Sequence, residues 1–203
     1  MNSTGALSDR VTIEKVETLS DRWRPLRSYT FRYRRRDGRE QTLVREIYER
    51  PEGAALLLAN VGKGTVVLIR QLRLPALING HPDGMLWEVP AGLLDDDSPA
   101  DAMRREAMEE TGFRVGDARP LFAAYTSAGA MTERLHFFVA EYADGDRVEA
   151  GGGHAGEGED IEVAEFAFED ALAMIGQGEI VDAKTIMLLL YAEAKGLFRS
   201  HVG

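Results

Sequence analysis

The alternation of apolar and polar positions predicts strands over the first 50 residues of the chain. Residues 11–50 follow a period of two, which is typical of half-exposed strands. Asp37-Gly38, between "SYTFRYRRR" and "EQTLVREIYER", is a hairpin signal. The first nine residues lack such a pattern, and we expect them to be frayed. Residues 1–50 are therefore predicted to form a small antiparallel β appendage.

Beyond residue 50, strand-like and helix-like patterns are mixed along the chain. The strand-like segments are "GAALLLAN", "GTVVLIRQLR", "MLWEVPAG" as far as Pro90, "PLFAAYTSA", "RLHFFVAEY" and "IEVAEF". Two segments, "FAFEDALAMIGQGEI" and "DAKTIMLLLYAEAKGLF", are apolar at helical spacing. "LINGHPDG" and the acidic "DGDRVEAGGGHAGEGED" are rich in turn formers and predict loops. Residues 51–203 are thus expected to form an α/β sandwich that carries the appendage.

A further helix is predicted between residues 98 and 112 from the signals at its two ends. Ser98 can cap its N-terminus, Pro99 suits the first turn, and Asp101 completes a Ser-x-x-Asp capping box. Gly112 suits the C-terminal exit. This helix contains most of the segment "RREAMEETGF", which is unusually rich in glutamate.

The glutamates of this helix lie on one side of it. Placed about 100° apart, Glu106, Glu109 and Glu110 fall with Ala102 within an arc of roughly 100°, and Met103 lies beside that arc. A solvated acidic face would lie opposite the apolar residues, whereas these carboxylates share the side that packs inward. Either they coat a solvated surface, or a divalent cation sits among them. Oxygen-only ligands would suit magnesium or manganese.

Composition and charge narrow the function classes. Acidic residues outnumber basic ones, 34 to 24, for a formal net charge of −10, which disfavours nucleic-acid binding. The absence of cysteine excludes disulfides, zinc–thiolate sites and thiol nucleophiles. No stretch could span a bilayer, and the N-terminus has no apolar signal core, so we expect a cytoplasmic protein with no membrane partner.

The spacing of the glutamates resembles the Nudix box. That family's pattern is Gly, five residues, Glu, seven residues, then Arg-Glu, two residues, Glu-Glu, one residue, Gly and a bulky apolar residue. The matching positions are Gly92, Arg105, Glu106, Glu109, Glu110, Gly112 and Phe113. The loop after Gly92 is one residue shorter than the pattern, and Asp97 stands nearest to the early Glu.

The resemblance implies an α/β/α sandwich with a mixed sheet and a hydrolase that cleaves a nucleoside diphosphate linked to another moiety. It implies Mg²⁺, with Mn²⁺ as an alternative, held by Glu106, Glu110 and the backbone carbonyl of Ala91. Arg105 would orient Glu109, which would lie behind the direct ligands or bind another metal ion. A loop acid would complete the shell or accept a proton as the loop closes, and Glu159 matches it best, with Glu157 as the other candidate.

Within the family, "IRQLR" resembles the nucleoside-diphosphate-sugar branch. "LINGHPDG", "AGLLDDDSP", "TSAGAMTERLHFF" and "GEIVDAKTIMLLLY" are closer to bacterial GDP-mannose hydrolases. Those enzymes release GMP and mannose 1-phosphate, and they form homodimers that exchange a β appendage. The resemblance assigns substrate contacts to Trp23, Val44, Arg45, Glu46, Arg73, Gly92, Leu93, Glu133 and Lys184, with Trp23 stacking on the base and Arg73 holding phosphate.

Several alternatives remain open from the sequence. An ADP-ribose pyrophosphatase of the same fold is one, and a catalytically silent Nudix sensor of nucleotide sugars is another. The glycine-rich stretch from Gly151 to Val163 is predicted to be mobile, either as a closing loop or as a disordered connection. Single residues also have simpler roles: Trp23 in the core, Arg45, Arg73 and Lys184 as surface charges, Glu46 and Glu133 as partners of arginines.

Overall fold

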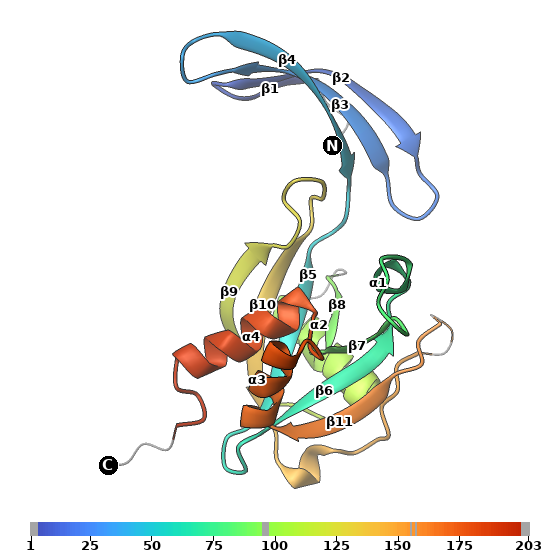
Figure 1. Cartoon of the computed structure of the whole chain (residues 1–203), viewed down its shortest axis with the longest axis vertical. Coiled ribbons are helices and arrows are strands. Elements are labelled where there is room, and N and C mark those ends of the chain that lie inside the picture. Colours follow the sequence, from blue (N-terminus) through green and yellow to red (C-terminus); the bar gives the residue numbers. More distant parts are fainter. Residues whose placement is uncertain (1–3, 95–97, 155, 157, 200–203) are drawn as a thin grey trace. The chain divides into compact units, whose positions relative to one another are not determined.

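The computed structural model describes residues 4–94, 98–154, 156 and 158–199. The chain forms two compact units (Figure 1). The N-terminal unit comprises residues 1–52 together with 125–134, and the C-terminal unit comprises residues 53–124 and 135–203. No helix of the described residues is long and apolar enough to cross a membrane.

The N-terminal unit is a four-stranded antiparallel sheet in the order β1-β2-β3-β4. Its strands are β1 (Gly5–Ser8), β2 (Val11–Ser20), β3 (Leu26–Arg34) and β4 (Glu40–Tyr48). Asp37-Gly38 forms the predicted turn between β3 and β4, and Gly38 has a φ of 85° there. The prediction of fraying is wrong for Gly5–Ser8, because these residues form β1 and pair with β2 along the sheet edge. Residues 1–3, which it also included, lie outside the described residues.

A mixed sheet forms the middle of the C-terminal unit. Its strands are β5 (Gly53–Asn60), β6 (Thr65–Leu72), β7 (Met85–Glu88), β8 (Ala91–Leu93), β9 (Arg119–Tyr125), β10 (Arg134–Glu141) and β11 (Glu162–Ala167). The order is β11-β6-β5-β10-β9, with β7 on β6 and β8 on β5. Strand β10 runs parallel to β5, whereas β6 and β8 run antiparallel to it. The mixed sheet is therefore confirmed.

Helices α2 (Pro99–Glu106), α3 (Phe168–Gln177) and α4 (Ala183–Ala194) cover the two faces of this sheet. The other helical elements are α1 (Leu74–Ile78), a π-helical turn η1 (Ala107–Thr111) that continues α2, and a short 3₁₀ turn η2 (Asp144–Asp146). Figure 1 shows α3 and α4 on one side of β5 and α2 on the other. This is the expected α/β/α sandwich. Helix α1 was not predicted, and it ends inside the segment expected to be a loop.

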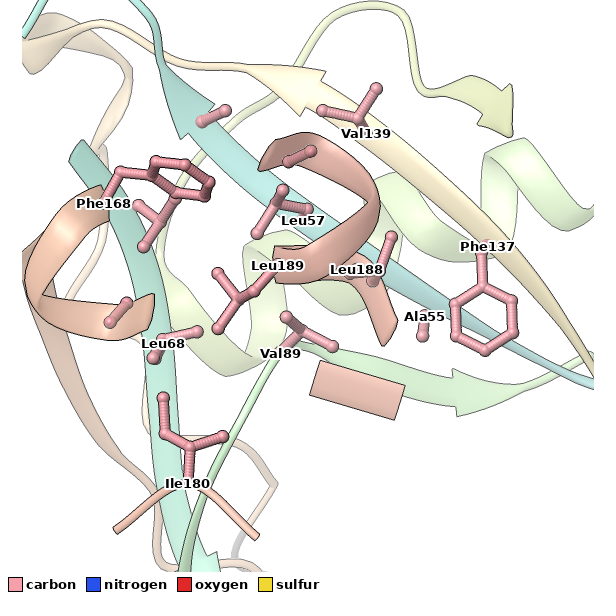
Figure 2. Packing of buried hydrophobic residues seen from close by; sticks show 14 of the residues in the cluster. Ala55, Leu57, Leu68, Val89, Phe137, Val139, Phe168, Ile180, Leu188 and Leu189 are labelled. Atoms are coloured by element: carbon pink, nitrogen blue, oxygen red, sulfur yellow. The ribbon is translucent and has the colours of Figure 1, made fainter. Parts of the chain in front are cut away.

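The central strand β5 has two buried faces. Ala55 and Leu57 face α3 and α4, where they pack with Phe168, Leu188 and Leu189 (Figure 2). The alternate side chains, Ala54, Leu56 and Leu58, pack with Met103 and Ala107 beneath the glutamate helix. Burial on both faces explains why the sequence of this strand is one unbroken apolar run. It also fixes the glutamate helix on the sheet, with its acidic side near β8.

Candidate active site

The glutamate helix begins as predicted but widens halfway. Ser98 Oγ accepts a hydrogen bond from the backbone N–H of Asp101 at 3.2 Å, and Pro99 occupies the first turn. After Glu106 the helix continues as the π turn η1, in which the Thr111 hydroxyl donates to the carbonyl of Ala107. Gly112 ends it with a φ of 75°. Single π turns recur at functional sites, and this one carries Glu109 and Glu110.

Position 92 requires glycine because the side chain of Glu106 lies very close to its backbone. A Cβ at Gly92 would collide with the carboxyl group of Glu106 and lie 2.7 Å from its Cγ. Gly92 lies in β8 opposite Ala54 of the central strand, so the sheet holds this backbone in place. Gly92, the first residue of the box, thus leaves room for the side chain of Glu106 against strand β8.

Glu110 is a buried carboxylate next to the same strand. Its exposed fraction is 2%, and Oε2 accepts a hydrogen bond from the N–H of Ala91 at 3.1 Å. Burial first, then the charge of Glu106, raises the pKa of Glu110 well above its ordinary value, and the charge of Glu159 adds to this. The Ala91 N–H and the charge of Arg73 act in the opposite direction. Glu110 therefore lies on the inward side of its helix, not on a solvated face.

Arg105 reaches both neighbouring carboxylates. Its Nη1 lies 3.1 Å from Glu106 Oε1 and 3.1 Å from Glu109 Oε2, one helical turn away. Glu109 is more open than Glu110, with 28% of its side chain exposed, and its Oε1 lies 3.5 Å from Nε2 of His154. The guanidinium is placed as expected of a group that orients Glu109, whereas the proximity of His154 was not predicted.

The glycine-rich segment docks onto the end of this helix. Gly152 N–H donates to the carbonyl of Glu110 at 2.9 Å, and Gly153 N–H donates to that of Glu109 at 3.0 Å. A Cβ at Gly151 would lie 2.5 Å from the carbonyl carbon of Thr111. The glycines were interpreted as a source of mobility, but Gly151 also permits close contact with the helix backbone, and Gly152 and Gly153 bond to that backbone through their N–H groups.

The docked segment brings Glu159 back toward the helix. Glu159 Oε2 accepts a hydrogen bond from the backbone N–H of His154 at 2.8 Å, and its charge contributes to the raised pKa of Glu110. Glu159 is thus close enough to the box carboxylates for its charge to act on them. Glu157, the other candidate loop acid, and Asp97 lie outside the described residues.

Two cations that were expected to contact the substrate, Arg73 and Lys184, share one buried acid. Glu88, at the end of β7, accepts hydrogen bonds from Arg73 Nε at 2.6 Å and Arg73 Nη2 at 2.8 Å, and from Nζ of Lys184. Burial alone would raise the pKa of Glu88, but the bond from Arg73 and the charge of Lys184 hold it below its ordinary value. Neither Arg73 nor Lys184 is an unattached surface charge.

Sequence reasoning missed Glu88 and Asp182. Lys184 Nζ also lies 2.9 Å from Asp182 Oδ1, and Asp182 caps α4 by accepting from the N–H of Thr185 at 2.9 Å. An acid between apolar residues in "MLWEVPAG", and an aspartate directly before a helix, were the available signals.

The other expected substrate residues belong to the N-terminal unit. Trp23 is 69% exposed, so it is not a core residue, and the guanidinium of Arg50 lies over its ring at 5.2 Å. Arg50 Nε also lies 3.0 Å from Glu133 Oε1, and Thr126 donates to Glu133 Oε2 at 3.0 Å. Glu133 is therefore an arginine partner, as the simpler interpretation holds, and Arg50 links it to Trp23. Arg50 itself was not predicted.

Val44, Arg45 and Glu46 are consecutive in β4 and all exposed. Arg45 lines a groove on one face of the sheet, and its Nη1 donates to the carbonyl of Val44 at 2.7 Å. Successive side chains of a strand point to opposite faces, so those of Val44 and Glu46 lie on the other face. A ligand on one face of this sheet can meet either the side chain of Arg45 or those of its two neighbours.

Comparison with known proteins agrees with the geometry of the box. A model described as the NUDIX domain matches residues 49–189, which is more than half of the chain. The chain belongs to the Nudix family. Residues 10–48 of this Nudix protein match the model described as the GDP-mannose pyrophosphatase NudK N-terminal domain.

Relatives of this Nudix hydrolase are similar over nearly their whole length. A protein of Pectobacterium atrosepticum named GDP-mannose pyrophosphatase is 50% identical over 192 residues, which cover 95% of this chain and 98% of that protein. Proteins of the same name from Yersinia enterocolitica and Escherichia coli O1:K1 are 50% and 48% identical over 191 residues, with 93% and 94% of this chain and 99% of each relative covered.

Nudix hydrolases generally use a divalent metal, and the side chains near β8 are of a chemical type that binds one. The side chains are carboxylates, which hard divalent cations prefer, and the like charges of Glu106 and Glu110 would be relieved by a cation. Among the described residues, no three Asp, Glu, His or Cys side chains are already gathered around one point. The expected ligands, two box carboxylates and the backbone carbonyl of Ala91, would therefore need a loop acid or water to complete a metal site.

Proposed function

We propose that this Nudix hydrolase cleaves the diphosphate of GDP-mannose, with water, to give GMP and mannose 1-phosphate. The observation that carries the proposal is the buried Glu110, placed between Ala91 and Glu106 in a box of the Nudix pattern. The names of relatives about half identical to this chain support GDP-mannose as the substrate.

The metal is proposed to be magnesium, with manganese as the alternative. Glu106, Glu110, the carbonyl of Ala91 and Glu159 would hold it. When bound, it neutralises the diphosphate and polarises phosphorus toward attack by water. Burial and the charge of Glu106 favour the protonated form of Glu110, whereas a bound cation would favour its ionised form.

The remaining residues are proposed to position the substrate and accept a proton. Arg105 orients Glu109, which with Glu159 is a candidate to accept the proton of the attacking water. Arg73 and Lys184 hold phosphate oxygens, for which the fork of Arg73 is well suited. Gly92 and Leu93 contact substrate from the strand that carries Ala91.

The N-terminal unit is proposed to bind the nucleotide. Trp23 is exposed enough to stack on a base, and Val44, Arg45, Glu46 and Glu133 would contact the rest of the nucleotide. We further propose that the protein acts in the cytoplasm as a homodimer, in which Trp23 or Arg45 of one copy serves the other copy.

The substrate is tested with magnesium and a panel of nucleotide sugars, with products identified by chromatography. GDP-mannose should be cleaved faster than ADP-ribose, and GMP should appear in equal amount to mannose 1-phosphate. Faster cleavage of ADP-ribose would make the protein an ADP-ribose pyrophosphatase of the same family. Binding of GDP-mannose without turnover of any compound would favour the silent sensor.

A further inference from the structure

Glu88 is an acid that the sheet buries almost completely. Its side chain is 1% exposed, and both of its oxygens accept hydrogen bonds from Arg73. One of these oxygens also accepts from Lys184 Nζ. A buried ion pair is often no more stabilising than apolar residues of similar volume, so stability alone does not account for three charges at this point. A function of the cations is the better account.

Lys184 is also held by the start of α4. Asp182 Oδ1 lies 2.9 Å from Lys184 Nζ, and Asp182 Oδ2 accepts from the Thr185 hydroxyl at 2.7 Å. The same hydroxyl oxygen accepts from the N–H of Val89, the residue after Glu88, at 2.8 Å. The contacts form a closed ring between β7 and α4. A closed ring leaves Lys184 little freedom to change its position.

Arg73, the other cation that Glu88 holds, is not part of this ring and faces outward. The Arg73 side chain is 40% exposed, although Glu88 behind it is buried. Its bond to Glu88 raises the pKa of Arg73, and the charges of Glu88 and Glu110 add to this. A guanidinium has five N–H donors, and the bonds to Glu88 involve only Nε and Nη2. The outer edge of Arg73 can therefore meet an anionic ligand without releasing Glu88.

We propose that Glu88 is a positioning residue, whose carboxylate fixes the fork of Arg73 and the ammonium of Lys184 in one arrangement that binds the diphosphate of the substrate. The inference rests on the proposed function for the nature of this ligand. The negative charge of Glu88 and its positioning of the two cations have opposite effects on the binding of an anion. Removing the negative charge of Glu88 makes the site more positive, so electrostatics alone would tighten anion binding, whereas loss of positioning weakens it.

The test compares Glu88→Gln with the wild type on whichever nucleotide sugar the wild type cleaves fastest. We expect KM to rise about tenfold or more, the size of one charge-assisted hydrogen bond, with kcat changed less than about threefold. Glu88→Asp keeps the charge on a shorter stem and should give an intermediate KM. Glu162→Gln is the matched control, since this acid on β11 is 59% exposed and its loss changes net charge equally. Its KM should equal that of the wild type.

Melting temperatures show whether each variant is folded. If Glu88→Gln does not fold, Asp182→Asn serves instead, because asparagine can still cap α4 while Lys184 loses a charged partner. An unchanged or lower KM in the folded variant overturns the inference. Cleavage of another nucleotide sugar in place of GDP-mannose overturns the proposed substrate but leaves this test intact. A wild type that cleaves no nucleotide sugar overturns the proposed function, and the ligand assumed here with it.

Discussion

At the scale of single residues, Glu110 combines burial with a like-charged neighbour. An acid whose pKa is raised by folding binds its proton more tightly in the folded state than in the unfolded state. It therefore reduces stability as the pH rises above the ordinary value of 4.5. The metal-free protein bears this cost at neutral pH, and a bound cation would remove it. The residue is thus placed for function at the expense of stability.

Glu110→Gln separates the effect of Glu110 on stability from its effect on cation binding. Glutamine keeps the size of the side chain and an oxygen that can accept from Ala91, but it has no charge to bind a cation. We expect the melting temperature of the metal-free variant at pH 7 to exceed that of the wild type, and this gain to shrink as the pH falls toward 4.5. Turnover with magnesium should fall at least a hundredfold, or about 2.7 kcal/mol of barrier.

Calorimetry with a chelator and product assays with magnesium measure the two quantities. Glu162→Gln, on the exposed side of β11, should change neither. A lower melting temperature combined with near-normal turnover in Glu110→Gln would contradict both the electrostatic cost and the metal role.

Single residues were predictable where local spacing placed them. Glu106, Glu109 and Glu110 follow from the period of one helix, and Ser98 follows from its capping signal. Contacts between distant segments were not predictable in this way. The pairing of Arg50 with Glu133 joins residues 83 positions apart, and only the folded chain brings them together. Lys184 reaches Glu88 across a similar separation.

At the scale of elements, the glutamate helix and the glycine segment form one structure. Backbone N–H groups of Gly152 and Gly153 satisfy carbonyls at the helix end, where helices leave such groups without internal partners. The sequence predicted both elements, but the glycines were interpreted only as a source of flexibility in the segment. Glycine also permits close approach of two backbones, and composition alone does not tell these two uses apart. The π turn was missed for a similar reason, because it leaves no composition signal.

Gly151→Ala tests this docking. The new Cβ would lie 2.5 Å from Thr111 carbonyl carbon and 2.7 Å from Glu110 carbonyl oxygen, both of them backbone atoms. We expect the segment to move away from the helix, with a lower melting temperature and a loss of turnover of about tenfold or more as Glu109 and Glu110 lose their support. Activity and calorimetry measure the effects.

Gly64→Ala is the matched control for backbone strain. Gly64 has a φ of 70°, close to the 72° of Gly151, but a Cβ there would meet nothing within 4 Å. It should cost about 1–2 kcal/mol for the left-handed conformation and leave turnover unchanged. Equal effects of the two substitutions would mean that strain, and not docking, explains the glycine.

At the scale of the whole molecule, the sandwich was predictable and the surface of the appendage was not. Strand-like apolar segments mixed with two segments apolar at helical spacing indicated an α/β sandwich. Among its described residues the N-terminal unit has strands but no helix to cover its sheet. One face carries a groove of about 480 Å³, lined largely by apolar side chains that include Val11, Phe31 and Ile47. An apolar sheet face of this kind is typical of an interaction surface.

In the proposed homodimer, a second copy of the chain fills this groove. Light scattering should then give a mass near twice the 22.4 kDa of one chain. Ile47→Lys places a charge in the groove and should shift the mass toward one chain and reduce turnover, because burying an unpaired ammonium is unfavourable. Thr42→Lys is the matched control, since Thr42 is exposed on the opposite face of the same strand, and it should remain dimeric and active. A fully active wild type with the mass of a single chain would rule out the dimer, and a dimeric Ile47→Lys variant would place its interface elsewhere.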